Sequence, residues 1–139
     1  MKNRFSSMVK TFATKPKKIF IVDSLGALLS AFIIVAMLMR YTDVFGMPKN
    51  SLFFLSIIAV IYATYSLCCY FFLDQNWRPY LKFIAFANLL YCCLTITFVT
   101  CSYASITTFG LIYFSVELIV IVCLATVEFM IASHLSAKK

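Results

Sequence analysis

The chain has 139 residues, of which 63% are hydrophobic and 12% are charged, and its mean hydropathy is +0.97. Ordinary soluble domains carry about 25% charged residues, and a fold of this size leaves much of its surface in water. The composition therefore excludes a soluble enzyme, a disordered regulator and a disulfide-stapled secreted domain. It predicts an integral membrane protein.

Residues 1–18 form a basic arm at the start of the chain. Phe5, Met8, Val9 and Phe12 recur at the spacing of one helical face, with lysines and an arginine around them. This pattern is typical of a short amphipathic helix that lies on an anionic membrane surface. The alternative is a basic tail that serves only to orient the chain. In either case we expect anionic lipid headgroups, and not nucleic acid, as the partner of the +7 net charge.

Four apolar runs are long enough to cross a bilayer, which takes about 20 helical residues. They cover residues 19–39, 51–73, 79–103 and 107–133. Such runs must be helical in lipid, where the backbone finds no water to bond, and short connections favour antiparallel neighbours. We therefore predict an all-α fold, an antiparallel up-down bundle of four transmembrane helices, in a membrane domain of residues 19–139.

The ends of three predicted helices carry recognisable signals. Pro79 suits the first turn of the third helix, where its missing N–H costs nothing. Asn50 or Ser51 is expected to cap the second helix, and Thr107 or Thr108 the fourth.

The distribution of Lys and Arg predicts the orientation. With four spans both termini share one side of the membrane, and that side carries ten Lys and Arg residues, whereas the other carries only Arg40 and Lys49. Positively charged loops remain in the cytoplasm. We expect both termini to be cytoplasmic.

The cysteines and the histidine do not form a recognisable catalytic or metal-binding motif. No C-x-x-C motif is present, and one histidine, His134, is available. Six cysteines fall within the predicted spans: Cys68, Cys69, Cys92, Cys93, Cys101 and Cys123. Buried cysteine behaves as a small apolar residue, so we expect packing roles for them. We predict no catalytic residue, no metal, no cofactor and no enzymatic activity, with a membrane redox enzyme as the remote alternative.

Ionisable residues inside the spans are the informative ones, because they are costly in lipid and usually face the bundle interior. Asp23, Lys82 and Glu128 fall at a similar depth near the cytoplasmic side. We interpret them as a charge cluster. It is either a structural tie, in which Asp23 or Glu128 pairs with Lys82, or a vestibule for a cation or a proton.

Glu117 falls near the middle of the fourth span, about 15 Å from its outer start. Asn88 and Tyr62 reach a similar depth on the third and second spans. We predict an intramembrane polar site made of these three residues. A neutral Glu117 bonded to Asn88 or Tyr62 would hold helices together; a proton- or cation-linked site and a contact with a partner protein are the alternatives.

Small and polar residues recur at helical spacing on three of the spans, where they let helices approach closely. They predict a packed bundle interior, and a narrow polar pore is the alternative. The residues are Asp23, Gly26, Ala27 and Ser30 on the first span; Ser56, Ala59, Ala63, Ser66 and Tyr70 on the second; and Ala85, Asn88, Cys92, Thr95 and Ser102 on the third.

Three short stretches resemble a group of short four-helix bacterial membrane proteins with no assigned activity: Phe45-Gly46-Met47-Pro48, Trp77-Arg78-Pro79-Tyr80-Leu81-Lys82 and Ala87-Asn88-Leu89-Leu90-Tyr91-Cys92. The similarity runs from about Val22 to Glu128, over helix ends and packing residues. It implies a four-helix fold in a bacterial membrane, and no functional residue carries over from it.

These observations lead to an expected function. We expect a small non-enzymatic integral membrane protein of a bacterial inner membrane, which either supports a larger membrane complex or forms a homo-oligomer. The alternative is a small proton- or cation-linked transporter or channel that uses Glu117 and Asn88.

Overall fold

A computed structural model of the chain describes residues 3–4, 6–7, 17–73 and 77–134, and these residues contain helices and no strand. The four long helices are α2 (Lys17–Ile33), α4 (Lys49–Phe72), α5 (Arg78–Cys101) and α6 (Thr108–His134). The prediction of four long apolar helices is confirmed. Every predicted end lies within two residues of the observed one when the π-helical segment that continues α2 to Leu38 is counted with it. The apolar face predicted for the N-terminal arm, Phe5, Met8, Val9 and Phe12, lies outside the described residues.

All four long helices are long and apolar enough to cross a membrane. Their outward surfaces are also apolar, with large side chains such as Phe32, Phe71 and Phe109 exposed. Soluble monomers rarely expose continuous apolar surface of this kind. The helices are therefore compatible with a small multi-pass membrane protein.

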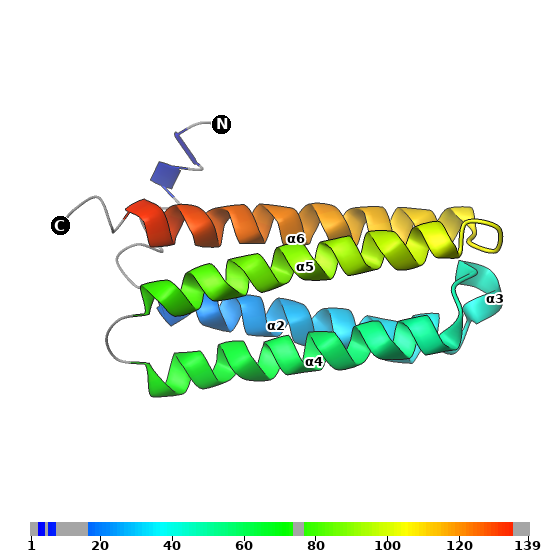
Figure 1. The fold of residues 1–139 in the computed structure, drawn as a ribbon, viewed down its shortest axis with the longest axis horizontal. Helices are drawn as coiled ribbons and strands as arrows, with labels where there is room; N and C mark the ends of the chain where they lie inside the picture. Colours follow the sequence, from blue (N-terminus) through cyan, green and yellow to red (C-terminus); the bar gives the residue numbers. More distant parts are fainter. Residues whose placement is uncertain (1–2, 5, 8–16, 74–76, 135–139) are drawn as a thin grey trace.

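The long helices lie along one axis, and the chain reverses direction from each to the next (Figure 1). α2 packs mainly on α4 and α5 packs mainly on α6, whereas α2 and α6 make few contacts. α2 begins and α6 ends at one end of the molecule, which we call the terminal end; α3 (Thr42–Phe45) lies at the opposite end, the loop end.

The first span ends in a π-helical segment, η1 (Ile34–Leu38), which continues α2 without a break. The N–H of Met39 donates to the carbonyl of Ile34 at 2.9 Å, a bond between residues five apart. The sequence predicts a uniform helix here, because a π turn carries no simple composition signal.

The loop end is held by bonds between the first and third connections. Gly46 ends α3 with φ 78°, in the left-handed region that glycine adopts most easily. The Ser105 hydroxyl donates to the Gly46 carbonyl at 2.8 Å, and the N–H of Thr107 donates to the Phe45 carbonyl at 3.2 Å. The short helix α3 therefore packs close to the start of α6.

Two of the predicted helix ends are confirmed and one is wrong. The Thr107 hydroxyl accepts from the N–H of Gly110 at 3.2 Å and so caps α6, and Pro79 lies in the first turn of α5. α4, however, starts at Lys49 after Pro48, and neither Asn50 nor Ser51 caps it. Pro48 has an extended backbone, which lets the helix begin two residues earlier without a side-chain cap.

Two apolar cores fill the space between the helices. One lies toward the loop end and includes Leu38, Leu52 and Phe114; the other lies toward the terminal end and includes Phe20 and Ile131. Six buried polar residues fall between these cores: Asp23 and Ser24 on α2, Ser66 on α4, Asn88 on α5, and Glu117 and Glu128 on α6. Ser56, Thr95 and Ser102 are also buried and lie nearer the loop end.

Candidate functional site

The buried polar residues form two groups, and the first is centred on Asn88 of α5. Its side-chain nitrogen Nδ2 donates to Asp23 Oδ1 at 2.9 Å and to Glu128 Oε2 at 3.1 Å. The hydroxyl of Ser66 on α4 donates to Asp23 Oδ2. We call Asp23, Ser66, Asn88 and Glu128 the Asn88 cluster. Because its members come from all four long helices, it ties them together near the terminal end.

The Asn88 cluster is buried and contains two acidic residues. Glu128 is fully buried and Asp23 is 3% exposed. One amide nitrogen supplies both of its hydrogens to these two carboxyl groups, so their oxygens lie close to each other. Glu128 Oε1 has no hydrogen-bond partner among the described residues. Two negative charges here would be very costly, so the arrangement is stable only when a proton or another cation neutralises at least one.

Lys82 lies apart from this cluster, although the sequence places it at the same depth. Its side chain is exposed on the outer surface of α5, and the residue that joins Asp23 and Glu128 is Asn88. The expected pairing with Lys82 is therefore not the one observed. Lys82 precedes Asn88 by six residues, which is about 240° around the helix at 100° per residue. The two side chains accordingly leave α5 on different faces.

The second group surrounds Glu117 of α6. Glu117 is 9% exposed, and its Oε1 accepts a hydrogen bond from the Ser30 hydroxyl of α2 and a longer one, 3.5 Å, from Tyr91 Oη of α5. Its other oxygen, Oε2, is buried and has no partner among the described residues. Glu117, near the middle of the fourth helix, therefore has one oxygen that accepts hydrogen bonds and one that does not.

The expected partners of Glu117 were Asn88 and Tyr62, and the structure gives it Ser30 and Tyr91 instead. Side chains lean toward the N-terminus of their helix. Glu117 therefore leans toward the loop end, whereas Asn88, on a helix of opposite direction, leans toward the terminal end. Tyr62 makes an edge contact with Tyr91, with ring centroids 6.3 Å apart, and so stands one residue further from the carboxyl group.

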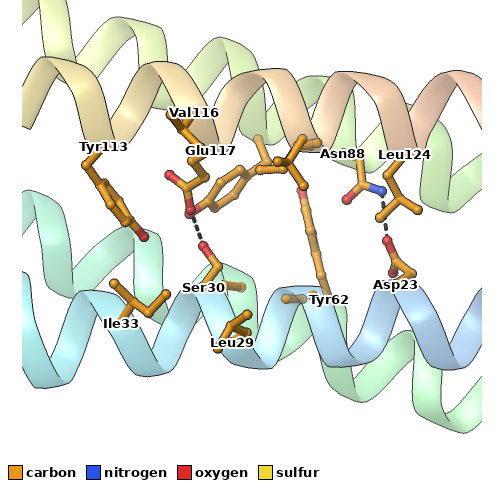
Figure 2. A pocket seen from close by; sticks show the side chains of 16 residues that line it. Asp23, Leu29, Ser30, Ile33, Tyr62, Asn88, Tyr113, Val116, Glu117 and Leu124 are labelled. Carbon is orange, nitrogen blue, oxygen red and sulfur yellow. Dashed lines mark hydrogen bonds between the residues drawn. The ribbon is translucent and has the colours of Figure 1, made fainter.

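A cavity of about 300 Å³ joins the two groups. Glu117, Ser30 and three tyrosines, Tyr62, Tyr91 and Tyr113, line one part of it, and Asp23 and Asn88 line another. The remaining wall is apolar, with Ile33, Val120, Ile121 and Leu124 among its residues. Figure 2 shows Glu117 and Tyr113 reaching from α6 toward α2, and Asn88 meeting Asp23 further along the same space.

Gly26 marks the side of α2 that faces this cavity. A Cβ atom built on Gly26 would meet no atom within 4 Å, so the helix has open space beside it. Leu29 on α2 and Val116 and Val120 on α6 line the cavity and are also exposed at the surface. The cavity therefore lies where α2 and α6 fail to pack, and its rim is the outer apolar surface of both helices.

Sequence reasoning missed Ser30 and Tyr91 as partners of Glu117. Ser30 follows Asp23 by seven residues and so shares its helical face, which is the signal that could have found it. Tyr91 follows Asn88 by three residues on the buried face of α5. Both residues lie on helical faces that the sequence pattern indicates. Which of them meets Glu117, however, depends on how far the helices are shifted relative to one another along the bundle axis.

The cysteines and the metal-binding residue types contribute little to the site. Cys69 and Cys92 are buried, and the other four cysteines are exposed. All six are free thiols. Within the described residues no group of three His, Cys, Asp or Glu side chains is placed to hold a metal ion.

No protein-family model, no curated protein and no solved structure matches the chain. The resemblance to short four-helix bacterial membrane proteins accordingly rests on the three stretches quoted above.

Proposed function

We propose that the chain is a small proton- or cation-linked membrane transporter whose binding group is Glu117. In this proposal the four helices form an up-down bundle across a bacterial inner membrane, with both termini in the cytoplasm. The protein acts without enzymatic chemistry and without a cofactor. The surroundings of Glu117 support the transporter role over the accessory role.

The observation that carries the proposal is the position of Glu117 Oε2, a buried oxygen without a partner in a residue that lines the cavity. Glu128 of the Asn88 cluster also has an unpaired oxygen, but Glu117 lines the cavity and Glu128 does not. An unpaired buried acceptor is costly, and at Glu117 the cavity has room for a ligand that would pair with it. A lone negative charge inside a membrane is costlier still. Glu117 is therefore stable when it carries a proton or when a cation stands beside it, and these two states exclude each other.

The Asn88 cluster supports the same proposal from the terminal end. Asp23 and Asn88 line the cavity that Glu117 lines, so the cavity extends from near the middle of α6 toward the proposed cytoplasmic side. Asp23 lies six residues from the first residue of α2, about 9 Å along the axis. A cation that enters from that side would meet acidic oxygens at both depths.

Flux through purified protein in liposomes tests the proposal. We expect the wild-type chain to dissipate an imposed pH gradient in the presence of a transported cation. Glu117→Gln keeps the shape and most of the hydrogen bonding of the side chain but cannot ionise, so it should abolish that flux while the protein still folds. Asp43→Asn, which removes an exposed carboxylate on α3, is the matched control and should behave as wild type. Wild-type flux in Glu117→Gln would overturn the proposal.

The accessory or homo-oligomeric role remains the second candidate, and α6 favours it. This helix is the least covered of the four, and it exposes Phe109, Ile112, Ile119 and Phe129. Purification in mild detergent, followed by identification of the proteins that remain bound, tests this role. A stoichiometric partner protein supports it, and a chain that purifies alone with Glu117-dependent flux contradicts it.

A further inference from the structure

The residues that line the cavity indicate the charge and the polarity of the ligand that it could bind. We infer that the ligand of Glu117 is a small organic ammonium ion with an apolar body, which reaches the cavity from the lipid between α2 and α6. This inference rests on the proposed function, because it assigns a ligand class to the same carboxyl group.

The charge of the ligand follows from the one carboxyl group and the aromatic rings near it. Glu117 offers a single unpartnered oxygen, and Tyr62, Tyr91 and Tyr113 line the same part of the cavity. Tyrosine faces attract ammonium groups, and the attraction is strongest where water is excluded. Hard inorganic cations prefer a shell of several oxygens. Asp23 also lines the cavity, but both of its oxygens already accept hydrogen bonds, from Ser66 and Asn88. The unpaired oxygen of Glu117 with three tyrosines therefore suits an ammonium group better than a metal cation.

The body of the ligand follows from the rest of the wall. Ile33, Val120, Ile121 and Leu124 line the cavity beyond the tyrosines, and such a surface binds an apolar group. A cavity of about 300 Å³ is at the small end of the range for small-molecule sites, which is about 300–1,000 Å³. Its size therefore fits an aromatic or branched amine and is too small for a two-chain lipid.

The route of entry follows from the poor packing between α2 and α6. These helices make few contacts, Gly26 has open space beside it, and Leu29 and Val116 are exposed at the cavity rim. In the proposed membrane this rim faces lipid. A cation with an apolar body concentrates in the membrane interface and can pass between the two helices. As it binds, the Glu117 carboxyl group releases its proton to the aqueous phase, and the carboxylate pairs with the ammonium.

Calorimetry with two probes of the same shape tests the inference on the full chain in detergent micelles. Benzyltrimethylammonium carries a permanent positive charge, and neopentylbenzene is its neutral carbon analogue. We expect wild-type protein to bind the ammonium ion, and Glu117→Gln to bind it at least tenfold more weakly. Any binding of neopentylbenzene should be the same in both proteins. Asp43→Asn removes the same charge outside the cavity and should bind as wild type does.

A second variant keeps the test valid if Glu117→Gln fails to fold. Gly26→Leu places a side chain in the open space beside α2 and leaves Glu117 intact, so we expect at least a tenfold loss of benzyltrimethylammonium affinity. Unchanged affinity in Gly26→Leu would overturn the inferred cavity. Binding of Na⁺ or K⁺ but not of benzyltrimethylammonium, in a Glu117-dependent manner, would overturn the ligand class and leave the proposed function standing. Equal binding of the ammonium ion by wild type and Glu117→Gln would overturn both.

Discussion

Ser30 on α2 donates a hydrogen bond to Glu117 on α6, across 87 residues of sequence and between two helices that otherwise make few contacts. The bond crosses the cavity and fixes one oxygen of the carboxyl group, while the other oxygen has no partner among the described residues. Variants of Ser30 measure the strength of this hydrogen bond, whereas Glu117→Gln tests whether the carboxyl group must ionise.

Removing the Ser30 hydroxyl should weaken the protein modestly. We expect Ser30→Ala to lower the free energy of unfolding by about 1 kcal/mol, the usual net value of a hydrogen bond; bonds between membrane helices average about 0.6 kcal/mol. A double-mutant cycle of Ser30→Ala with Glu117→Ala, which removes the acceptor as well, measures the coupling between the two side chains by reversible unfolding in mixed micelles.

Thr126→Ala is the control for that cycle. The Thr126 hydroxyl is exposed and bonds the Val122 carbonyl within its own helix, so we expect no coupling with Glu117. Coupling of the same size in both cycles would show that the Ser30 bond has no specific role.

Among these substitutions, replacing Asn88 should lower the free energy of unfolding most. Asn88→Asp has nearly the same shape, but it removes both donated hydrogen bonds and adds a third acid beside Asp23 and Glu128. Each buried group that is left without its hydrogen bond costs about 1–3 kcal/mol. We expect a loss of at least this size, measured as the free energy of unfolding in micelles. Asn50→Asp makes the same exchange at an exposed position near the start of α4, and it should be neutral or slightly stabilising. Equal effects of the two variants would contradict the role given to Asn88.

Replacement by alanine should change the stability in opposite directions at Gly26 and at Gly110. Gly26→Ala meets open space and should stabilise α2 by about 0.5–1 kcal/mol, because alanine is the better helix former. Gly110→Ala would make its Cβ clash with the Phe45 carbonyl oxygen, so it should separate α3 from α6 and destabilise the loop end. Thermal unfolding of the two variants in detergent measures the contrast. A loss of stability in Gly26→Ala would mean that α2 and α6 pack more closely than described.

The orientation prediction is tested by reporters on the intact chain in bacterial cells. Fusions at Lys139 should report the cytoplasm and fusions at Lys49 the exterior, because the proposed four-span topology assigns ten Lys and Arg residues to one side and two to the other. A C-terminal reporter on the exterior would overturn the proposed topology.

The sequence was sufficient to predict the long helices, since hydropathy and length determine where such helices begin and end. It also pointed to Asp23, Asn88, Glu117 and Glu128 as the polar residues of interest, and all four are buried. It did not predict their partners. Residue counting gives depth to within a helical turn, whereas the pairing of Asn88 with Glu128, and of Glu117 with Ser30, depends on the direction in which side chains lean and on the relative shift of the helices. The π turn of η1 and the four-residue helix α3 have no comparable sequence signal.

We propose that Glu117 exchanges a proton for a cation, and infrared difference spectroscopy of the carboxyl stretch measures this exchange. Spectra of purified wild-type protein, with and without benzyltrimethylammonium, would be compared with those of Glu117→Gln under the same conditions. We expect the protonated-carboxyl band of wild type to lose intensity when the cation binds, and this change to be absent in Glu117→Gln. A carboxyl band that is unaffected by the cation, or that changes equally in both proteins, would contradict the proposed exchange.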